Sequence, residues 1–387
     1  MADSAAGAAT GERPTRPVMS TPRTVDIELT SRCNARCAYC YYFDNPEVVY
    51  DDLPTADWLA FFGELGRLGV MDVVLAGGEP LLRADLPELL QAVVDNRMRF
   101  TLLSNGALLT DELAALLAAS GRCNSVQISI DGPTAEVHDR ARGAGSFDAA
   151  VAAIRLLLRH GLPVTSRLTI HNDNVEAIPE TVAFLLDELG LPGMSTNAVG
   201  FLGSCKASGG APLLDDRGRA RAMELLLRVS ERYPGRIDAL DGPQVWARQW
   251  VEFEALAAAG APPLPGGGAL TACGCAWSKL AVRADGAIVV CSLLPQLALG
   301  RINVDDLQDV WLHHPVLQAH RRREAIALET FEQCAGCDFA PYCTGNCPAV
   351  GYAMTGLVDH PNPDSCLRLY RARGGRLPGD AAEVPGG

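Results

Sequence analysis

Three cysteines with an unusual spacing lie near the start of the chain, in the stretch SRCNARCAYCYYF of residues 31–43. Cys33, Cys37 and Cys40 form the pattern C-x3-C-x2-C. A structural zinc ion takes four protein ligands and a disulfide takes two cysteines, whereas a 4Fe–4S cluster normally has one Cys on each iron. Three thiolates on one loop would leave one iron free to bind a small molecule through its amine and carboxylate. A partial zinc site and three packed thiols are the alternatives.

A second cysteine-rich region holds eight cysteines within 94 residues. Its spacing is C-x-C, then a single cysteine, then C-x2-C-x5-C-x3-C and a last cysteine, which in isolation would also suit two zinc knuckles. Thirteen cysteines in a chain without an export signal are more typical of metal ligands than of disulfides. The eight residues are Cys273, Cys275, Cys291, Cys334, Cys337, Cys343, Cys347 and Cys366.

Polar motifs follow the predicted strands that come after the first cysteine loop. GGEP follows the second strand at residues 77–80, SNG follows the third at residues 104–106, and SIDG follows the fourth at residues 129–132. In β/α barrels the active site is built from loops at the carboxyl ends of the strands. These motifs and the cysteine loop are therefore expected to lie together.

The elements that must position these motifs alternate between short apolar strands and amphipathic helices. Six strands are predicted between TVDIEL and TNAVGFLG, and their continuous apolar runs are typical of a parallel sheet covered by helices. No G-x-G-x-x-G follows the first strand and no Walker A motif is present, which disfavours a nucleotide-binding doubly wound sheet. The fold class predicted is α/β, a partial (β/α)6 TIM-like barrel.

The stretch CNARCAYC resembles the C-x3-C-x2-φ-C signature of the radical S-adenosylmethionine (SAM) superfamily, with Tyr39 at the aromatic position. The resemblance implies an enzyme in which Cys33, Cys37 and Cys40 hold a 4Fe–4S cluster whose open iron binds SAM. Such enzymes cleave SAM reductively to a 5′-deoxyadenosyl radical that removes a hydrogen atom from substrate. The SAM-binding residues that it implies are Tyr39, Gly77, Gly78, Glu79, Ser104, Asn105, Ser129 and Asp131, with Arg142 and Arg167 as candidates for the SAM carboxylate.

The C-terminal cysteine pattern is similar to the SPASM extension of that superfamily, which usually carries two auxiliary 4Fe–4S clusters. By the family's interleaved ligation, Cys273 or Cys275 would hold the nearer cluster together with Cys291 and Cys347. If Cys275 is not a ligand, the nearer cluster has an open iron. The resemblance assigns the distal cluster to Cys334, Cys337, Cys343 and Cys366.

The stretches CYYFDNPEVVYDDLP and TNAVGFLGSC look most like the maturases of SynChlorMet-type cassettes, which modify ribosomally made (RiPP) peptides. We therefore expect a peptide maturase that forms a C–C, C–O or thioether crosslink. A peptide epimerase, with Cys205 as the tentative hydrogen donor, is an alternative. A dehydrogenase or epimerase of a small antibiotic sugar and a non-enzymatic zinc-binding scaffold are the others. Ser292 stands where sulfatase maturases have an Asp base, which disfavours that reaction.

The implied partners are a precursor peptide and an electron donor such as flavodoxin or ferredoxin. Only 22 residues precede the first predicted strand, so a leader peptide is expected to need a separate leader-binding protein or a surface of the barrel. The net charge of -13 disfavours nucleic-acid and anionic-membrane binding. No apolar run is long enough to span a bilayer and no signal peptide is evident, so a cytoplasmic protein is expected.

The changes in composition along the chain predict five regions. Cysteine-rich sequence replaces the β/α alternation beyond the Pro- and Gly-rich stretch APPLPGGG. The predicted regions are a disordered N-terminal tail over residues 1–22, a radical SAM core over 23–235, a connector over 236–272, a SPASM domain over 273–370 and a flexible C-terminal tail over 371–387.

Overall fold

A ten-stranded sheet forms the centre of the molecule, which is a computed structural model that describes residues 17–46 and 48–380. The strand order is β10-β9-β8-β1-β2-β3-β4-β5-β6-β7, and every neighbouring pair from β8 to β7 is parallel. The strands are β1 Thr24–Thr30, β2 Asp72–Gly77, β3 Arg99–Ser104, β4 Cys123–Ser129, β5 Val164–Ile170, β6 Met194–Ala198, β7 Ile237–Ala239, β8 Lys279–Val282, β9 Ala287–Val289 and β10 Ala298–Arg301.

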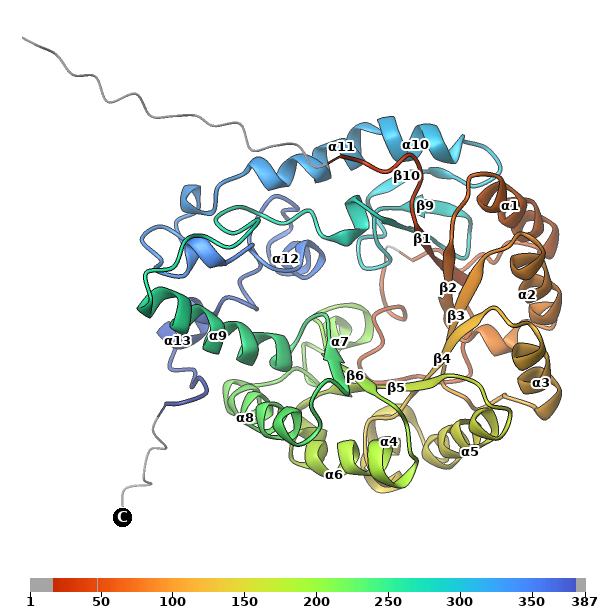
Figure 1. Ribbon diagram of the computed structural model, residues 1–387, viewed down its shortest axis with the longest axis horizontal. Coiled ribbons are helices and arrows are strands. Elements are labelled where there is room, and N and C mark those ends of the chain that lie inside the picture. Colours follow the sequence, from red (N-terminus) through yellow and green to blue (C-terminus); the bar gives the residue numbers. More distant parts are fainter. Residues whose placement is uncertain (1–16, 47, 381–387) are drawn as a thin grey trace, which may run out of the picture.

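Helices connect the parallel strands and lie outside the arc that the sheet describes (Figure 1). The helices of this half are α1 Thr55–Arg67, α2 Leu86–Asp95, α3 Asp111–Ala119, α4 Ala135–Arg142, α5 Ser146–Arg159, α6 Ile178–Ala183, α7 Gly203–Ala207 and α8 Asp216–Arg232. The helices of the rest are α9 Pro243–Ala258, α10 Leu307–His313, α11 Pro315–Arg322, α12 Pro348–Thr355 and α13 Leu367–Ala372.

The predicted α/β class with a parallel sheet is confirmed, and the sheet continues beyond the six predicted strands. Strand β7, within the predicted connector, pairs in parallel with β6. Strand β8, from the cysteine-rich region, pairs in parallel with β1, with Thr24 opposite Lys279 and Ile27 opposite Val282. The cysteine-rich region therefore extends the same sheet as the core, and β10 and β7 are its two edges.

Strand β1 shows how the sequence separates the two faces of the sheet. Val25, Ile27 and Leu29 are fully buried in the main hydrophobic core, which also includes residues of the helices outside the arc. Side chains alternate between faces along a strand, so Asp26 and Glu28 point to the opposite face, inside the arc. This polar inner face is where the functional motifs gather.

The ends of the described chain pack against the fold. The indole Nε1 of Trp311 donates to the carbonyl of Met19 at 2.7 Å, so the residues before β1 lie against α10. At the other end Leu377 is buried in a second core with Trp246, Trp250 and Tyr370. Residues 1–16 and 381–387 of the two predicted tails lie outside the described residues.

Within the described residues, no helix combines the length and the apolar character that crossing a membrane requires.

Candidate active site

The loop cysteine group consists of Cys33, Cys37 and Cys40, which follow β1 directly. All three are free, half-buried thiols, and the Cys37 sulfur interacts electrostatically with the other two. Burial is the largest cause that raises the pKa of Cys37 to about 11. The start of the loop is fixed by Asp52, whose carboxylate accepts hydrogen bonds from the Ser31 amide at 2.6 Å and the Ser31 hydroxyl at 2.7 Å.

The glycines of the GGEP motif allow the cysteine loop to approach β2 closely. A Cβ atom on Gly78 would lie 2.1 Å from the carbonyl oxygen of Arg32, and one on Gly77 would lie 2.4 Å from that of Thr30. The Gly78 amide donates to the Thr30 carbonyl at 2.8 Å, and the Glu79 amide donates to the Arg32 carbonyl at 2.8 Å. Only residues without a side chain fit at this contact.

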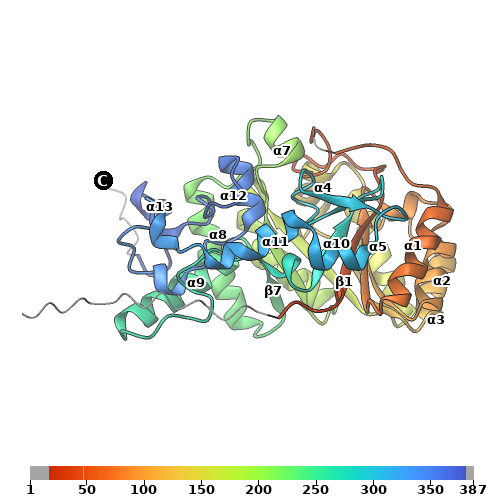
Figure 2. The same cartoon turned by 90° about the horizontal axis from the view of Figure 1, so that it is seen from above.

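Helix α7 holds the opposite side of the loop. Gly203 begins this helix at φ +47°, and a Cβ atom there would lie 2.3 Å from the carbonyl oxygen of Cys40. The amide of Ser204 donates to the same carbonyl at 2.8 Å. Figure 2 shows α7 on the same face of the molecule as the segment that follows β1. The loop is thus held between the GGEP backbone and α7.

Glu79 joins two of the predicted motifs at the ends of their strands. Its side chain is 1% exposed and accepts hydrogen bonds from the Ser104 hydroxyl and the Asn105 amide, both at 2.8 Å. Burial raises the pKa of Glu79, and it outweighs these hydrogen bonds, which lower the pKa. The Asn105 side chain in turn donates to the side chain of Asn34 in the cysteine loop at 2.8 Å. The structure therefore brings GGEP, SNG and the loop together.

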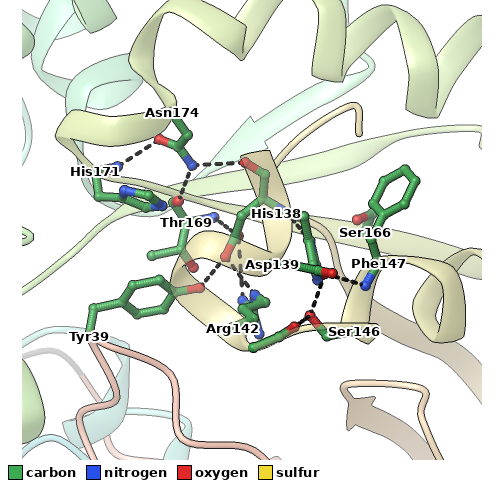
Figure 3. Close-up of polar contacts among 12 residues, drawn as sticks. Tyr39, His138, Asp139, Arg142, Ser146, Phe147, Ser166, Thr169, His171 and Asn174 are labelled. Atoms are coloured by element: carbon green, nitrogen blue, oxygen red, sulfur yellow. Dashed lines mark hydrogen bonds and ion pairs between the residues drawn. The ribbon is translucent and has the colours of Figure 1, made fainter. Parts of the chain in front are cut away.

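Asp131 is the centre of a buried polar network. Figure 3 labels its partners Tyr39, Arg142 and Thr169. Its carboxylate accepts hydrogen bonds from the Tyr39 hydroxyl, from Arg142 Nε at 2.5 Å and from the Thr169 amide at 2.9 Å. Burial alone would raise the pKa of Asp131, but Arg142 and Tyr39 outweigh burial and the pKa is lowered. Asp131 therefore fixes the loop aromatic residue and Arg142 relative to β5.

The remaining predicted SAM-binding residues are placed apart from this network. Arg167 donates from Nε to the Ser195 hydroxyl at 3.1 Å, and its charge interacts with Asp238 and Asp26. Ser129 ends β4 and is the register partner of Arg167. Arg142 and Arg167 thus have different partners, and Arg142 is the one that contacts the cysteine loop.

Cys205, the tentative hydrogen donor, lies within α7. Its side chain has no exposed surface, and burial raises the pKa of the thiol to about 11. The Cys205 side chain is therefore packed inside the protein, one residue after the amide that donates to the Cys40 carbonyl.

The distal cysteine group consists of the four predicted distal ligands, which line one pocket. The sulfur of Cys334 interacts electrostatically with the other three sulfurs, and burial, the largest cause, helps to raise its pKa to about 12. The members of the group are Cys334, Cys337, Cys343 and Cys366.

The near cysteine group consists of Cys273, Cys275, Cys291 and Cys347, whose sulfurs also interact with one another. Cys273 has φ +61°, a conformation that residues other than glycine rarely adopt. The neighbouring Cys275 side chain is the main cause that lowers the pKa of Cys273 to about 6. Both cysteines of the C-x-C pair therefore belong to the group.

The three groups have the numbers of thiols that iron–sulfur clusters require. Within residues 17–46 and 48–380, no three His, Cys, Asp or Glu side chains are arranged to hold one metal ion. The thiols instead gather as sets of three, four and four, the last set around a pocket. Four thiolates around an open space are what a cubane requires, since each Cys binds a different iron.

Three residues beside these groups were not identified from the sequence. Glu28, 4% exposed on the inner face of β1, interacts with the side chains of Ser292 and Tyr41. The alternation of polar and apolar residues along β1 could have indicated that Glu28 faces the site. His320 and Arg323 are buried beside the near cysteine group, far from any motif, so no local signal could have identified them.

Comparisons with known proteins agree with this geometry. The radical SAM superfamily model matches residues 27–185, and the SPASM iron–sulfur cluster-binding domain matches residues 273–338. The AdoMet-dependent heme synthase of Methanosarcina barkeri (strain Fusaro / DSM 804) is 29% identical over 87% of this chain and 94% of that protein. The mycofactocin maturase MftC of Mycolicibacterium smegmatis (strain ATCC 700084 / mc(2)155) is 29% identical over 92% of this chain and 85% of that protein.

Among solved structures, Streptococcus suis SuiB bound to precursor peptide SuiA has a TM-score of 0.67 at 18% identity, over 90% of this chain and 77% of that chain. The likeness shows a shared fold. A radical SAM domain binds a 4Fe–4S cluster and SAM, and a SPASM domain binds auxiliary iron–sulfur clusters. The chain therefore contains a radical SAM domain and a C-terminal SPASM domain, each with its gathered thiols, and it is an enzyme.

Proposed function

We propose that the protein is a peptide maturase that removes hydrogen from a ribosomally made precursor peptide and forms a crosslink in it. The observation that carries the proposal is the gathering of eleven thiols into three groups. The similarity to the mycofactocin maturase supports a peptide substrate. A crosslink is an oxidation, so it requires a site that accepts the second electron, and the auxiliary thiol groups suit that need.

Cys33, Cys37 and Cys40 would hold the cluster that binds SAM. When bound, this cluster and SAM supply the 5′-deoxyadenosyl radical. The chain's own contribution is to fix the surroundings: Asp131 orients Tyr39, and Glu79 joins the ends of β2 and β3. The GGEP glycines and α7 hold the loop on its two sides, which keeps the reacting groups in place.

The near and distal cysteine groups would hold two auxiliary clusters. Tyr41 follows Cys40 and interacts electrostatically with both Cys40 and Cys291, so its side chain lies within electrostatic range of both groups. This arrangement suits transfer of the second electron from substrate to the near group. The further partners in this proposal are a flavodoxin or ferredoxin as electron donor and a leader-binding protein, in the reducing cytoplasm.

Co-expression with the precursor peptide tests the proposal. The peptide is expected to lose two hydrogen atoms when it is crosslinked, as measured by mass spectrometry, and the Cys37→Ala variant is expected to leave it unchanged. The matched control is Cys123→Ala, because Cys123 lies on β4 outside the three groups. Formation of 5′-deoxyadenosine without any mass change would point to epimerisation, and normal 5′-deoxyadenosine formation by Cys37→Ala would refute the loop assignment.

A small-molecule substrate is the second candidate, because the heme synthase of Methanosarcina barkeri matches this chain over nearly its whole length. Incubation of the reduced enzyme and SAM with an iron porphyrin distinguishes the two. A changed porphyrin and an unchanged peptide would favour this candidate over the peptide maturase.

A further inference from the structure

A helical segment of residues 315–325 covers the turn that carries the C-x-C pair. It comprises α11 and the short 3-10 helix Arg323–Ala325 that follows it. Arg321 donates from Nε to the carbonyl of Ala276, next to Cys275, at 2.8 Å. The segment is therefore fixed to the backbone that presents the near cysteine group.

Arg323 reaches furthest into this contact and has no exposed surface. Its Nε donates to the carbonyl of Thr271 at 3.0 Å, and its Nη1 lies 3.3 Å from a carboxylate oxygen of Asp359. Its Nη2 is fully buried and has no hydrogen-bond partner among the residues the structure describes. A buried donor left without an acceptor costs ~1–3 kcal/mol, so an acceptor is expected at this position.

Beyond Asp359, sulfurs of the near cysteine group lie around Arg323, and they would carry negative charge as cluster ligands. The guanidinium interacts electrostatically with Cys275 and Cys347. His320, one turn earlier and 2% exposed, places Nε2 4.0 Å from the Cys275 sulfur. The buried side chains of Arg323 and His320 therefore both lie beside the near cysteine group. The cysteine spacing did not predict either of them.

We propose that Arg323 donates a hydrogen bond from Nη2 to the near auxiliary cluster and, together with His320, raises its reduction potential. Reduction adds negative charge to the cluster, and a buried cation with a hydrogen bond stabilises that added charge. Outer groups of this kind tune a metal centre as strongly as some ligands do. A raised potential suits the acceptor of an electron from substrate. The inference rests on the proposed near cluster, and it requires no particular substrate.

The test is a redox titration of the reconstituted full-length protein, followed by electron paramagnetic resonance. Cys33, Cys37 and Cys40 are replaced by Ala in every sample, so that only auxiliary signals remain. Arg323→Gln is expected to shift the reduction equilibrium of one auxiliary signal about tenfold toward the oxidised form, which is ~59 mV for one electron. Arg323→Lys keeps the charge without the planar fork and is expected to shift it less. Arg322→Gln, at the adjacent exposed arginine, is the matched control and is expected to shift neither signal.

Three outcomes would overturn the proposal. Arg323→Gln with full iron content and the parent potential would show that Nη2 does not act on the cluster. Equal shifts in Arg322→Gln would show a general effect of surface charge. Loss of iron from both Arg323 variants would assign the residue to folding. Because the titration contains no substrate, an enzyme inactive on peptides leaves the result unaffected, and an unchanged potential leaves the peptide proposal standing.

Discussion

At the scale of single residues, the cysteine loop depends on a charged pair that does not bind metal. Asp131 is fully buried and the Arg142 side chain is 12% exposed. The pair is joined to the loop through the Tyr39 hydroxyl, which donates to Asp131, and through the Arg142 guanidinium, which lies over the Tyr39 ring. Asp131 also accepts from the backbone of β5, so one carboxylate links the loop, α4 and the sheet. Pairs of this kind are costly to break because the remaining charge stays buried.

The Asp131→Asn variant is therefore expected to lose ~3–5 kcal/mol of unfolding free energy, since Arg142 would lack its counter-charge. Urea unfolding of the reconstituted protein without oxygen measures this loss. Asp173→Asn is the matched control, because the Asp173 side chain is 64% exposed. Equal unfolding midpoints for the two variants would contradict the structural role assigned to Asp131.

Glu28 predicts a dependence of stability on pH. Burial, the largest cause, raises the pKa of Glu28 from its usual 4.5 to about 8. A raised pKa means that the folded state holds the proton more tightly, so this contribution to stability is fully present below pH 4.5 and is lost as the pH rises toward 8. The loss is at most ~1.4 kcal/mol per pH unit.

In a Glu28→Gln variant this loss is expected to disappear, because the amide does not ionise. Thermal unfolding of parent and variant at several values between pH 5 and 8 measures the difference, with the exposed Glu180→Gln as control. Parallel pH profiles for the parent and Glu28→Gln would show that Glu28 is already ionised in the folded protein.

The sequence indicated some of these residues and not others for a physical reason. Glu79 and Asp131 belong to motifs at strand ends, where topology guarantees that the motifs meet. Arg323 meets the near cysteine group only through packing between segments distant in the sequence. Arg167 sits in a strand like its neighbours, and only the register shows that it lies opposite Ser129, apart from Arg142.

At the scale of elements, α7 is a short helix whose first residue determines how closely it contacts the loop. The Gly203→Ala variant is expected to push α7 away from the Cys40 carbonyl and to lower the iron retained by the loop cysteine group. Gly209→Ala is a strict control: both glycines have positive φ, but a Cβ atom on Gly209 would meet nothing within 4 Å.

Iron content and 5′-deoxyadenosine formation measure the effect of the two glycine variants. If both lose iron equally, the cause is backbone strain at positive φ, and the close contact with Cys40 is unimportant.

At the scale of the whole molecule, the distal cysteine group is separate from the other two in its ligands and its pocket. The Cys343→Ala variant is therefore expected to lose about four irons per chain and its modified peptide, because one cubane is lost. The cluster in the loop should remain, so uncoupled cleavage of SAM should continue. Iron analysis and 5′-deoxyadenosine measurements test this against Cys123→Ala, and an unchanged iron content would show that Cys343 is not a ligand.

Much of the core could be predicted because continuous apolar runs and β/α alternation are local signals. DVVLAG and VTSRLTI coincide with β2 and β5. Strands β7 and β8 were not predicted, since they are three and four residues long and depend on the edges that they extend. A short strand gains its stability from its neighbours, which composition does not reveal.

The pairing of β8 with β1 has a consequence for protein engineering. Four consecutive register partners bind the cysteine-rich region to the first strand of the core. A chimera that exchanges C-terminal halves between relatives would therefore need a junction that preserves this strand pair. Joining the halves at the preceding Pro- and Gly-rich stretch would transplant the metal ligands and leave an unmatched sheet edge behind them.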